Sequence, residues 1–544
     1  MMKRRDFLRA GALGSAAVFI HDAAEAGERA PLIGVNPLPA SMPGSFDLEE
    51  ATIADLQRDM VAGRRTARSI AQGYIDRIES LDRKGPSLRA ILEINPDALS
   101  IAEDLDRERK ARGVRGPLHG IPVLIKDNID TADRMTTTAG SYALEGSIPS
   151  RDAFIVRRLR EAGAIILGKT NLSEWANFRS TSSSSGWSGR GGQARNPYVL
   201  DRNTCGSSSG TGSAIAANFA AIGVGTETDG SIVCPSALNG IVGIKPTLGL
   251  VSRSGIIPIA HSQDTAGPMT RTVTDAAILL GALAGVDLRD RATAVSRGNS
   301  RPDYTRFLNV DGLKGARIGV ARAKYFGYSN AADKLVNEAI DLMKRRGAVI
   351  VDPANIPTAG KFDDTEFEVL LYEFKADLNA YLASLGPNAR VKSLADIIAF
   401  NEREKAKEMP WFGQEIMIMA QKKGPLTDKK YRDALAKNLR MSRTEGIDAV
   451  MNKHRLDALV APTGTPAWPI DLVNGDHYKG GSSTPAAVAG YPNISVPAGF
   501  VGELPVGISF FGRAWSEPKL ISIAYAYEQA SHHRRPPKFL ATFQ

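Results

Sequence analysis

Residues 120–126 read Gly-Ile-Pro-Val-Leu-Ile-Lys, and this short segment indicates how the chain folds. The run from Ile121 to Ile125 is continuously apolar, a pattern that is typical of a strand buried on both faces of a sheet. Lys126 then stands at the tip of that strand. The segment therefore predicts a buried sheet that presents a lysine at one edge.

Helical and strand patterns alternate along the rest of the chain. Helices are expected over residues 51–62, 70–81, 96–112, 153–162, 212–221 and 273–284. Strands are expected at 164–167, 316–320, 458–461, 494–496 and 506–511. This alternation predicts an α/β fold with a buried sheet. Residues 300–455 are more charged and more helical than the rest, so we expect a cap or an insertion there.

Serine and glycine dominate residues 180–213, a composition that alone would suggest a flexible linker. Apolar segments flank this stretch on both sides, and residues 225–236 continue its small-residue character. Glycines of this kind suit a backbone that approaches a ligand closely, where no side chain fits. We therefore expect a site here rather than a linker.

Serine hydrolysis needs an activated hydroxyl group, a base and backbone donors for an oxyanion. The chain has no Gly-x-Ser-x-Gly elbow with a matching Asp and His downstream, and its seven histidines form no pair with metal-ligand spacing. It does have a lysine at a strand tip, a serine-rich loop at 205–210 and a glycine-serine turn at 230–231. These features predict serine chemistry without a catalytic metal or a cofactor.

Several long motifs resemble the amidase signature family, and within it the peptide-amidase branch. They are Gly120-Ile-Pro-Val-Leu-Ile-Lys126-Asp-Asn128, Cys205-Gly-Ser207-Ser-Ser-Gly210, Gly225-Thr-Glu-Thr-Asp-Gly-Ser231-Ile-Val-Cys-Pro235, Gly240-Ile-Val-Gly-Ile-Lys-Pro246 and Gln263-Asp-Thr-Ala-Gly-Pro268. Shorter matches follow at 461–463, 489–492 and 504–507. The resemblance implies an α/β/α fold, with a large twisted mixed sheet covered by helices, and a single catalytic domain over residues 45–544.

The resemblance also implies roles for particular residues. Ser231 would be the nucleophile, Ser207 a bridging serine held by an unusual cis peptide bond, and Lys126 the terminal base. A neutral lysine at pH 7 requires its pKa to fall by about 3 units from ~10.4, which burial can supply. The oxyanion would be bound by backbone N–H groups in the turn formed by Thr228, Asp229, Gly230 and Ser231.

Two further residues are candidates for supporting these catalytic groups. Ser208 adjoins the bridging serine, and Asp264 lies in the last of the long motifs. For Asp264, a role in a turn or at a helix N-cap is an equally good interpretation.

By resemblance, the reaction is hydrolysis of a primary carboxamide, with peptide C-terminal amides as the expected substrates. Many family members carry Gly-Gly before the bridging serine and an arginine two residues after the nucleophile. This chain has Cys205-Gly206 and Val233, as the peptide-amidase branch does. The missing cation argues against a small carboxylate substrate at that point.

Three alternatives remain open on sequence. The first is a broad amidase or esterase acting on small aliphatic or aryl amides. The second is an amidotransferase-type subunit that supplies ammonia to a partner. The third is a catalytically inactive binding protein, which the presence of Lys126, Ser207 and Ser231 disfavours.

The N-terminus has the order of an export signal. Lys3-Arg4-Arg5 and Phe7-Leu8 precede an uncharged stretch at 10–20 and then Ala24-Glu25-Ala26. Residues 1–26 therefore predict a twin-arginine export signal and a periplasmic or secreted protein, with residues 27–44 as an N-terminal extension.

The formal net charge is +9, with 68 Lys and Arg against 59 Asp and Glu. No basic run with interleaved aromatic residues occurs, which disfavours a nucleic-acid partner, and no later stretch predicts membrane insertion. Of the two cysteines, Cys205 and Cys234, we expect buried free thiols, because a chain folded before export first meets a reducing cytosol. A single bridge between them remains possible. Cys234 is expected to serve in packing rather than in catalysis.

Overall fold

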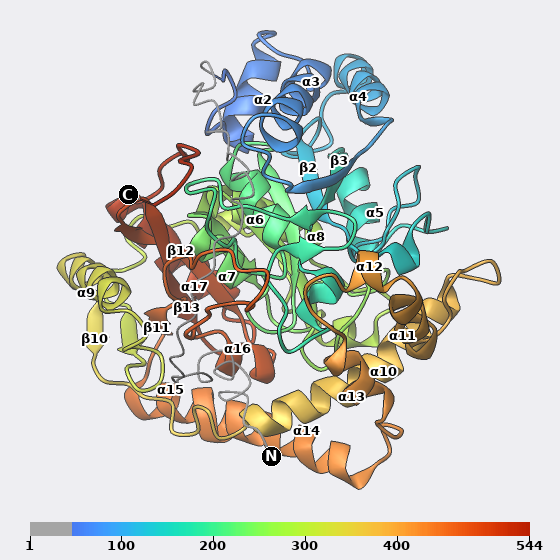
Figure 1. Ribbon diagram of the computed structural model, residues 1–544. Helices are drawn as coiled ribbons and strands as arrows, with labels where there is room; N and C mark the ends of the chain where they lie inside the picture. Colours follow the sequence, from blue (N-terminus) through green and yellow to red (C-terminus); the bar gives the residue numbers. More distant parts are fainter. Residues whose placement is uncertain (1–45, 544) are drawn as a thin grey trace, which may run out of the picture.

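The computed structural model describes residues 46–543, in which helices cover a sheet of 11 strands (Figure 1). The strand order is β1-β3-β2-β6-β8-β7-β12-β13-β11-β9-β10. The predicted export signal (1–26) and the extension (27–44) lie outside the described residues. The expected large mixed sheet is therefore confirmed.

The strands of the main sheet are β1 (Ile91–Ile94), β2 (Pro122–Lys126), β3 (Ile165–Thr170), β6 (Ile222–Glu227), β7 (Val242–Lys245), β8 (Thr265–Thr270), β9 (Arg317–Val320), β10 (Val349–Val351), β11 (Ala458–Pro462), β12 (Asn493–Val501) and β13 (Leu504–Phe511). A separate two-stranded sheet consists of β4 (Trp187–Ser188) and β5 (Gly192–Gln193).

The α-helices are α2 (Ile53–Val61), α3 (Ala67–Ile78), α4 (Ala98–Arg112), α5 (Phe154–Glu161), α6 (Ser209–Ala216), α7 (Val233–Leu238), α8 (Val273–Leu283), α9 (Asn330–Arg345), α10 (Asp363–Ser384), α11 (Leu394–Arg403), α12 (Lys405–Glu408), α13 (Glu415–Gln421), α14 (Lys429–Ser442), α15 (Asp448–His454), α16 (Thr484–Ala489) and α17 (Glu517–Ser531). None of them is both long enough and apolar enough to cross a membrane, a statement that covers the described part of the chain.

Strand direction brings the predicted catalytic segments together. β2 runs parallel to β3 and to β6, whereas β6 pairs antiparallel with β8. Parallel neighbours end at the same edge of a sheet, so Lys126 at the end of β2 and the turn that follows β6 lie at one edge. That turn contains residues 228–232 and leads into α7.

Helices pack on both faces of the sheet. α5, α8, α17 and α9 follow one another along one layer, while α6 contacts α7 and both helices contact the central strands. Glycines in β6 and β7 allow α6 and α7 to lie close against the sheet. A Cβ atom at Gly223 would lie 2.8 Å from Thr211 Cγ2, and one at Gly243 would lie 2.2 Å from Ser236 Oγ. The serine- and glycine-rich composition thus serves close helix-sheet packing.

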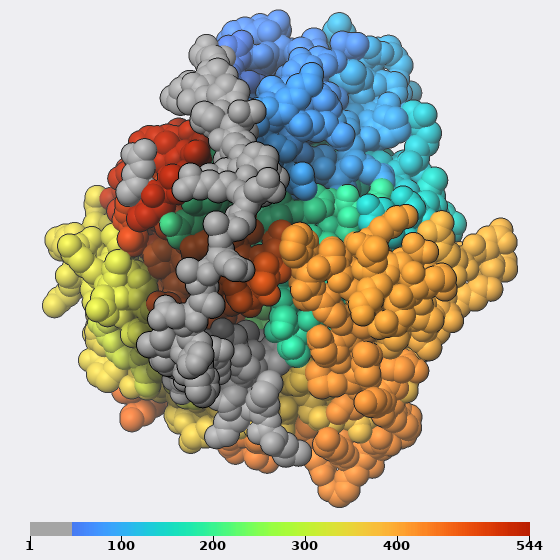
Figure 2. Space-filling model, viewed as in Figure 1, coloured from blue at the N-terminus to red at the C-terminus, as the bar shows by residue number. Residues whose placement is uncertain are grey.

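Two groups of helices extend the molecule beyond the sheet. α2, α3 and α4 gather at one end, and the orange helices of the 400–450 region lie at the opposite side of the same view (Figures 1 and 2). Residues 300–455 also supply β9, which pairs with β11 in the main sheet, and β10, which pairs with β9 at its edge. This region is therefore part helical layer and part sheet edge.

Most expected elements occur within a few residues of their predicted positions, but α6 differs. It was expected at 212–221 and is found at Ser209–Ala216. The chain turns at Asn218, where φ is 61°, so the apolar residues that follow belong to the approach to β6 and not to the helix.

Replacing Phe510 by Ala tests the centre of the sheet. Phe510 is fully buried in β13, and its ring lies 5.6 Å from that of Tyr527 in α17. We expect the free energy of unfolding to fall by about 3–5 kcal/mol, as for other buried Phe→Ala changes. Urea denaturation would measure the loss, and the exposed Val473→Ala, which should change stability by less than about 0.5 kcal/mol, is the control.

Candidate active site

Lys126 is fully buried at the end of β2, and its amine is held by polar groups of two other segments. Nζ lies 2.8 Å from Ser207 Oγ, 2.9 Å from Thr226 Oγ1 and 3.4 Å from the carbonyl oxygen of Thr226. Burial lowers the pKa of Lys126 from 10.5 to about 7, although the negative charges of Asp264 and Glu227 act in the opposite direction. The amine can therefore exchange a proton near neutral pH.

Ser207 sits between this lysine and the start of α6. Its peptide bond to Gly206 is cis, as the family resemblance implied. The neighbouring Ser208 is fully buried, and its hydroxyl donates to the carbonyl oxygen of Thr226 at 3.1 Å and accepts from the N–H of Thr226 at 3.2 Å. Ser208 therefore fixes the Ser207 segment to β6, a supporting position of the kind expected for it.

Ser231 lies in the turn between β6 and α7 and is 8% exposed. Its carbonyl oxygen accepts from the N–H of Ser208 at 3.1 Å, so the two predicted catalytic serines belong to segments in direct contact. Within residues 46–543, no hydrogen bond joins the hydroxyl groups of Ser207 and Ser231. A hydrogen bond thus connects the side chains of Lys126 and Ser207, and a backbone hydrogen bond to Ser208 places Ser231 next to this pair.

Glu227, the last residue of β6, anchors the turn that contains Ser231. One oxygen of its buried carboxylate accepts from the N–H groups of Ile232 and Val233, at 2.8 and 3.0 Å. Burial raises the pKa of Glu227, and the charge of the buried Lys245 lowers it. In turn, burial lowers the pKa of Lys245 to about 8. Glu227 and Lys245 therefore interact electrostatically in the interior next to the residues that follow Ser231.

The predicted oxyanion turn is supported from two directions. Thr228 Oγ1 donates to Asp264 at 2.6 Å, and Gln263 Nε2 donates to the carbonyl oxygen of Thr228 at 3.2 Å. The carboxylate of Asp229 accepts from Ser483 Oγ at 2.5 Å and from Thr484 Oγ1 at 2.8 Å. Gly230 has φ of 83°, a left-handed conformation that favours glycine. The turn is thus fixed, and its use as an oxyanion site stays a prediction.

Asp264 makes hydrogen bonds that are compatible with both of the roles considered for it. Its second oxygen accepts from the N–H groups of Ile259 and Ala260, at 2.8 and 2.9 Å, which closes a turn. Its first oxygen reaches Thr228, as described. Burial raises the pKa of Asp264 to about 6, so the group is mostly ionised at neutral pH.

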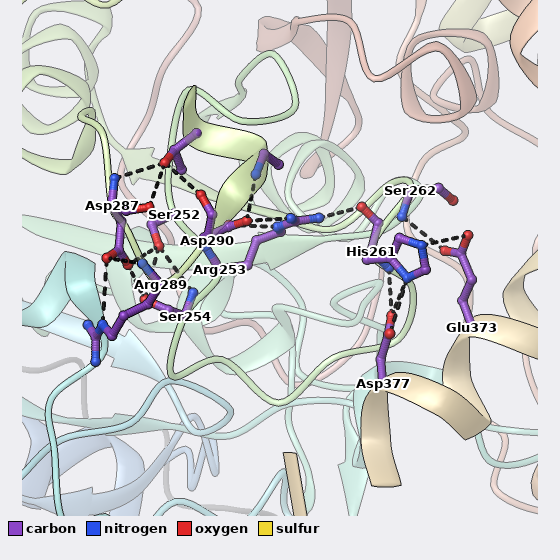
Figure 3. Close-up of polar contacts among 12 residues, drawn as sticks. Ser252, Arg253, Ser254, His261, Ser262, Asp287, Arg289, Asp290, Glu373 and Asp377 are labelled. Atoms are coloured by element: carbon purple, nitrogen blue, oxygen red, sulfur yellow. Dashed lines mark hydrogen bonds and ion pairs between the residues drawn. The ribbon is translucent and has the colours of Figure 1, made fainter. Parts of the chain in front are cut away.

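The loop that carries Asp264 is anchored by ionic contacts (Figure 3). Arg253 pairs with Asp290 at 2.6 Å and also donates to the carbonyl oxygen of His261. His261 Nδ1 lies 2.9 Å from Asp377 and its Nε2 lies 3.4 Å from Glu373, both on α10. The loop is therefore tied to α10 on one side and to the segment after α8 on the other.

His261, Glu373 and Asp377 also have the residue types of a metal site, with possible ligand atoms within 4.8 Å of one another. However, each ring nitrogen of His261 faces a different carboxylate, which suits a protonated imidazole. The hydrogen bond with Asp377 raises the pKa of His261. Ion pairing accounts for the cluster, and the absence of a catalytic metal stays a prediction.

The expectation for the cysteines was wrong. Cys205 and Cys234 form a disulfide, with their Cα atoms 5.9 Å apart. They are separated by 29 residues in sequence, and the contact between the Ser207 segment and α7 brings them together. Their spacing alone gave no sign of this proximity.

Sequence analysis also missed several polar residues. Thr226, Glu227 and Gln263 lie inside the long motifs but carried no predicted role. Asn128, whose Nδ2 donates to Thr226 Oγ1 at 3.1 Å, belongs to the same network. Ser483 and Thr484 had no sequence signal, because their contact with Asp229 spans some 250 residues.

The fold is that of known amide hydrolases. A peptide amidase from Stenotrophomonas maltophilia superposes with a TM-score of 0.88 at 52% identity, covering 91% of this chain and 100% of the other. A probable amidase of Arabidopsis thaliana is 45% identical over 91% of this chain and 93% of its own length. A glutamyl-tRNA(Gln) amidotransferase subunit from Carboxydothermus hydrogenoformans is 36% identical over 91% of this chain and 100% of its own.

The family model Amidase matches residues 69–521. The chain therefore belongs to the amidase family, and it is an amidase with the amidase signature fold in a single domain.

The electrostatics of Lys126 predict the pH dependence of activity. Since Lys126 must be neutral to accept a proton, kcat/KM should fall below a pH of about 7, the pKa that burial gives this lysine. The negative charge of Asp264 raises that pKa, so Asp264→Asn should move the acid limb to lower pH by up to about 1 unit.

Full pH profiles of kcat/KM would measure the shift. Asp311→Asn removes an exposed carboxylate from another part of the surface and should leave the limb in place. An acid limb that does not move in Asp264→Asn would contradict the electrostatic link between the two groups.

Proposed function

We propose that this amidase hydrolyses primary carboxamides, chiefly the C-terminal amides of peptides, to an acid and ammonia through an acyl-enzyme on Ser231. The observation that carries the catalytic part is the 2.8 Å contact between the buried amine of Lys126 and Ser207 Oγ. A buried amine with a pKa of about 7 is a competent base at neutral pH.

The proposed relay moves protons without a histidine. Ser231 Oγ attacks the amide carbonyl carbon as its proton passes to Ser207 Oγ, whose own proton passes to Lys126 Nζ. The same path in reverse protonates the leaving nitrogen, which departs as ammonia. Water then attacks the ester on Ser231, and the relay accepts one of its protons, so that the acid is released and the enzyme is restored.

We assign the oxyanion to the turn of Thr228, Asp229, Gly230 and Ser231. Its rigidity supports this assignment, because Asp264, Gln263, Ser483 and Thr484 fix its side chains and backbone before substrate binds. Preorganised donors stabilise a developing negative charge without reorganisation during the reaction.

Two observations support a peptide amide as substrate. The Stenotrophomonas maltophilia protein, at 52% identity, is a peptide amidase. Val233 stands where a cation for a small carboxylate would be expected.

Ammonia release from a short C-terminally amidated peptide tests the proposal directly. Wild type should release ammonia, whereas Ser231→Ala should abolish turnover because no acyl-enzyme can form. Ser207→Ala and Lys126→Ala should lower kcat by at least about 100-fold, since each interrupts the proton path. Circular dichroism would verify that the variants are folded.

A panel of other amides separates the alternatives. Faster turnover of small aliphatic or aryl amides than of peptide amides would overturn the substrate assignment but keep the nucleophile. Near-normal hydrolysis by Ser231→Ala would overturn the mechanism. Efficient hydrolysis of free glutamine, with no activity on peptide amides, would favour an ammonia-supplying amidotransferase component.

We also propose that residues 1–26 direct export to the periplasm or the medium. The basis is the order Arg4-Arg5, Phe7-Leu8, the uncharged stretch and Ala24-Glu25-Ala26. In a bacterial host, Arg4→Lys with Arg5→Lys should retain the enzyme in the cytoplasm, whereas Lys3→Arg should not. Cell fractionation followed by immunoblotting would measure the distribution, and equal export of both variants would exclude a twin-arginine signal.

A further inference from the structure

The Cys205–Cys234 disulfide connects the two segments that carry the predicted catalytic serines. Cys205 lies two residues before Ser207, and Cys234 lies three residues after Ser231. The first cysteine belongs to the loop that enters α6, and the second lies in the first turn of α7. The bridge thus joins the two segments whose hydroxyl groups exchange a proton in the proposed relay.

We propose that this disulfide is a positioning cross-link of the active site, so that the amidase reaches full activity only in its oxidised form. The inference rests on the proposed relay through Ser207 and Ser231. It extends that relay by naming what holds its two halves in register.

The bridge acts together with non-covalent contacts between the two segments. Ser208 N–H donates to the carbonyl oxygen of Ser231, and Asn239 Nδ2, at the end of α7, donates to the carbonyl oxygen of Thr204 at 3.0 Å. Neither contact involves the catalytic hydroxyl groups themselves. The bridge instead fixes Cα atoms only two and three residues from those hydroxyl groups.

The surroundings of Cys205 are fixed independently of Cys234. The N–H of Cys205 donates to Asn203 Oδ1 at 2.7 Å, and its carbonyl oxygen accepts from Ser209 Oγ at 2.7 Å. α7 has its own anchor, because Glu227 holds the N–H groups of Ile232 and Val233. Each segment therefore has anchors of its own, and the bridge is the covalent link that adds to the hydrogen bonds between the two segments.

Catalysis is sensitive to such register. A displacement of ~1 Å between reacting groups can cost about 100-fold in rate, far more than the same displacement costs in stability. Opening the bridge should consequently reduce kcat while the protein stays folded. Substrate affinity should change less, because the bridge is assigned to the register of the relay and not to substrate binding.

The redox chemistry is an ordinary thiol-disulfide exchange. Closing the bridge removes two protons and two electrons from the thiols of Cys205 and Cys234, and a disulfide oxidant takes them up as it becomes a dithiol. A dithiol reductant reverses the step. Disulfides persist in oxidising compartments, so an exported enzyme would acquire its full activity after leaving the cytosol.

The test compares oxidised and reduced enzyme in the absence of denaturant. Wild type is treated with dithiothreitol, and the two liberated thiols are counted by alkylation and mass spectrometry. We expect kcat for ammonia release to fall at least about 10-fold with KM changed less than about 3-fold. Reoxidation should restore kcat.

A matched pair of variants separates positioning from stability. Cys205→Ser with Cys234→Ser should show the same low kcat and no response to dithiothreitol. Val336→Ala, a buried position in α9, should lower the melting temperature without lowering kcat.

Fully reduced wild type that retains kcat within 2-fold would overturn the inference, as would restoration of activity in the serine double variant on stabilisation with glycerol. Failure of the proposed function looks different, since oxidised wild type would then release no ammonia from any peptide amide.

Discussion

The burial of one amine, that of Lys126, is the constraint on which the site depends. Keeping an ammonium ion in this position is disfavoured by about 5 kcal/mol relative to water, the equivalent of lowering the lysine pKa from 10.5 to about 7. This requires a strand covered on both faces, which β3 and β6 provide at the sides and helices provide above and below. It also requires hydroxyl groups rather than carboxylates as nearest partners, and Ser207 and Thr226 meet that need.

Near this lysine the strand pairing changes from parallel to antiparallel, and this change determines which segments meet at the site. On one side, β2, β3 and β6 are parallel and deliver their ends to a common edge. From β8 to β13 the neighbours are antiparallel, so this half returns the chain to the same edge through the segments that carry Asp264 and Ser483. Acid-base groups and Glu227 thus come from the parallel half, and the side chains that contact Thr228 and Asp229 come from the antiparallel half.

Sequence patterns predicted the parts that depend on local chemistry. Local patterns predict these parts: the apolar run before Lys126 predicts a strand, the helical spacing predicts the outer helices, and the small residues predict turns. The start of α6 was not predictable in this way, because Ser209 and Gly210 are weak helix formers and the helix starts there for tertiary reasons. A Cβ atom at Gly210 would lie 2.4 Å from the carbonyl oxygens of Ala90 and Asn171, contacts that no local pattern encodes. The pairing of the cysteines and the contacts of Asp229 could not be predicted for the same reason: they join segments that are far apart in the sequence.

The position of β12 and β13 in the sheet has a consequence for biosynthesis. These strands lie between β7 and β11, yet they occur at residues 493–511, close to the end of the chain. On the ribosome, β7 therefore has no permanent neighbour on that side until the C-terminal segment emerges, and its edge stays uncovered while about 250 further residues are translated. Such an edge is open to pairing with other chains, and a product that lacks β12 and β13 cannot complete its sheet. Completion of the sheet therefore waits for the last strands to be synthesised.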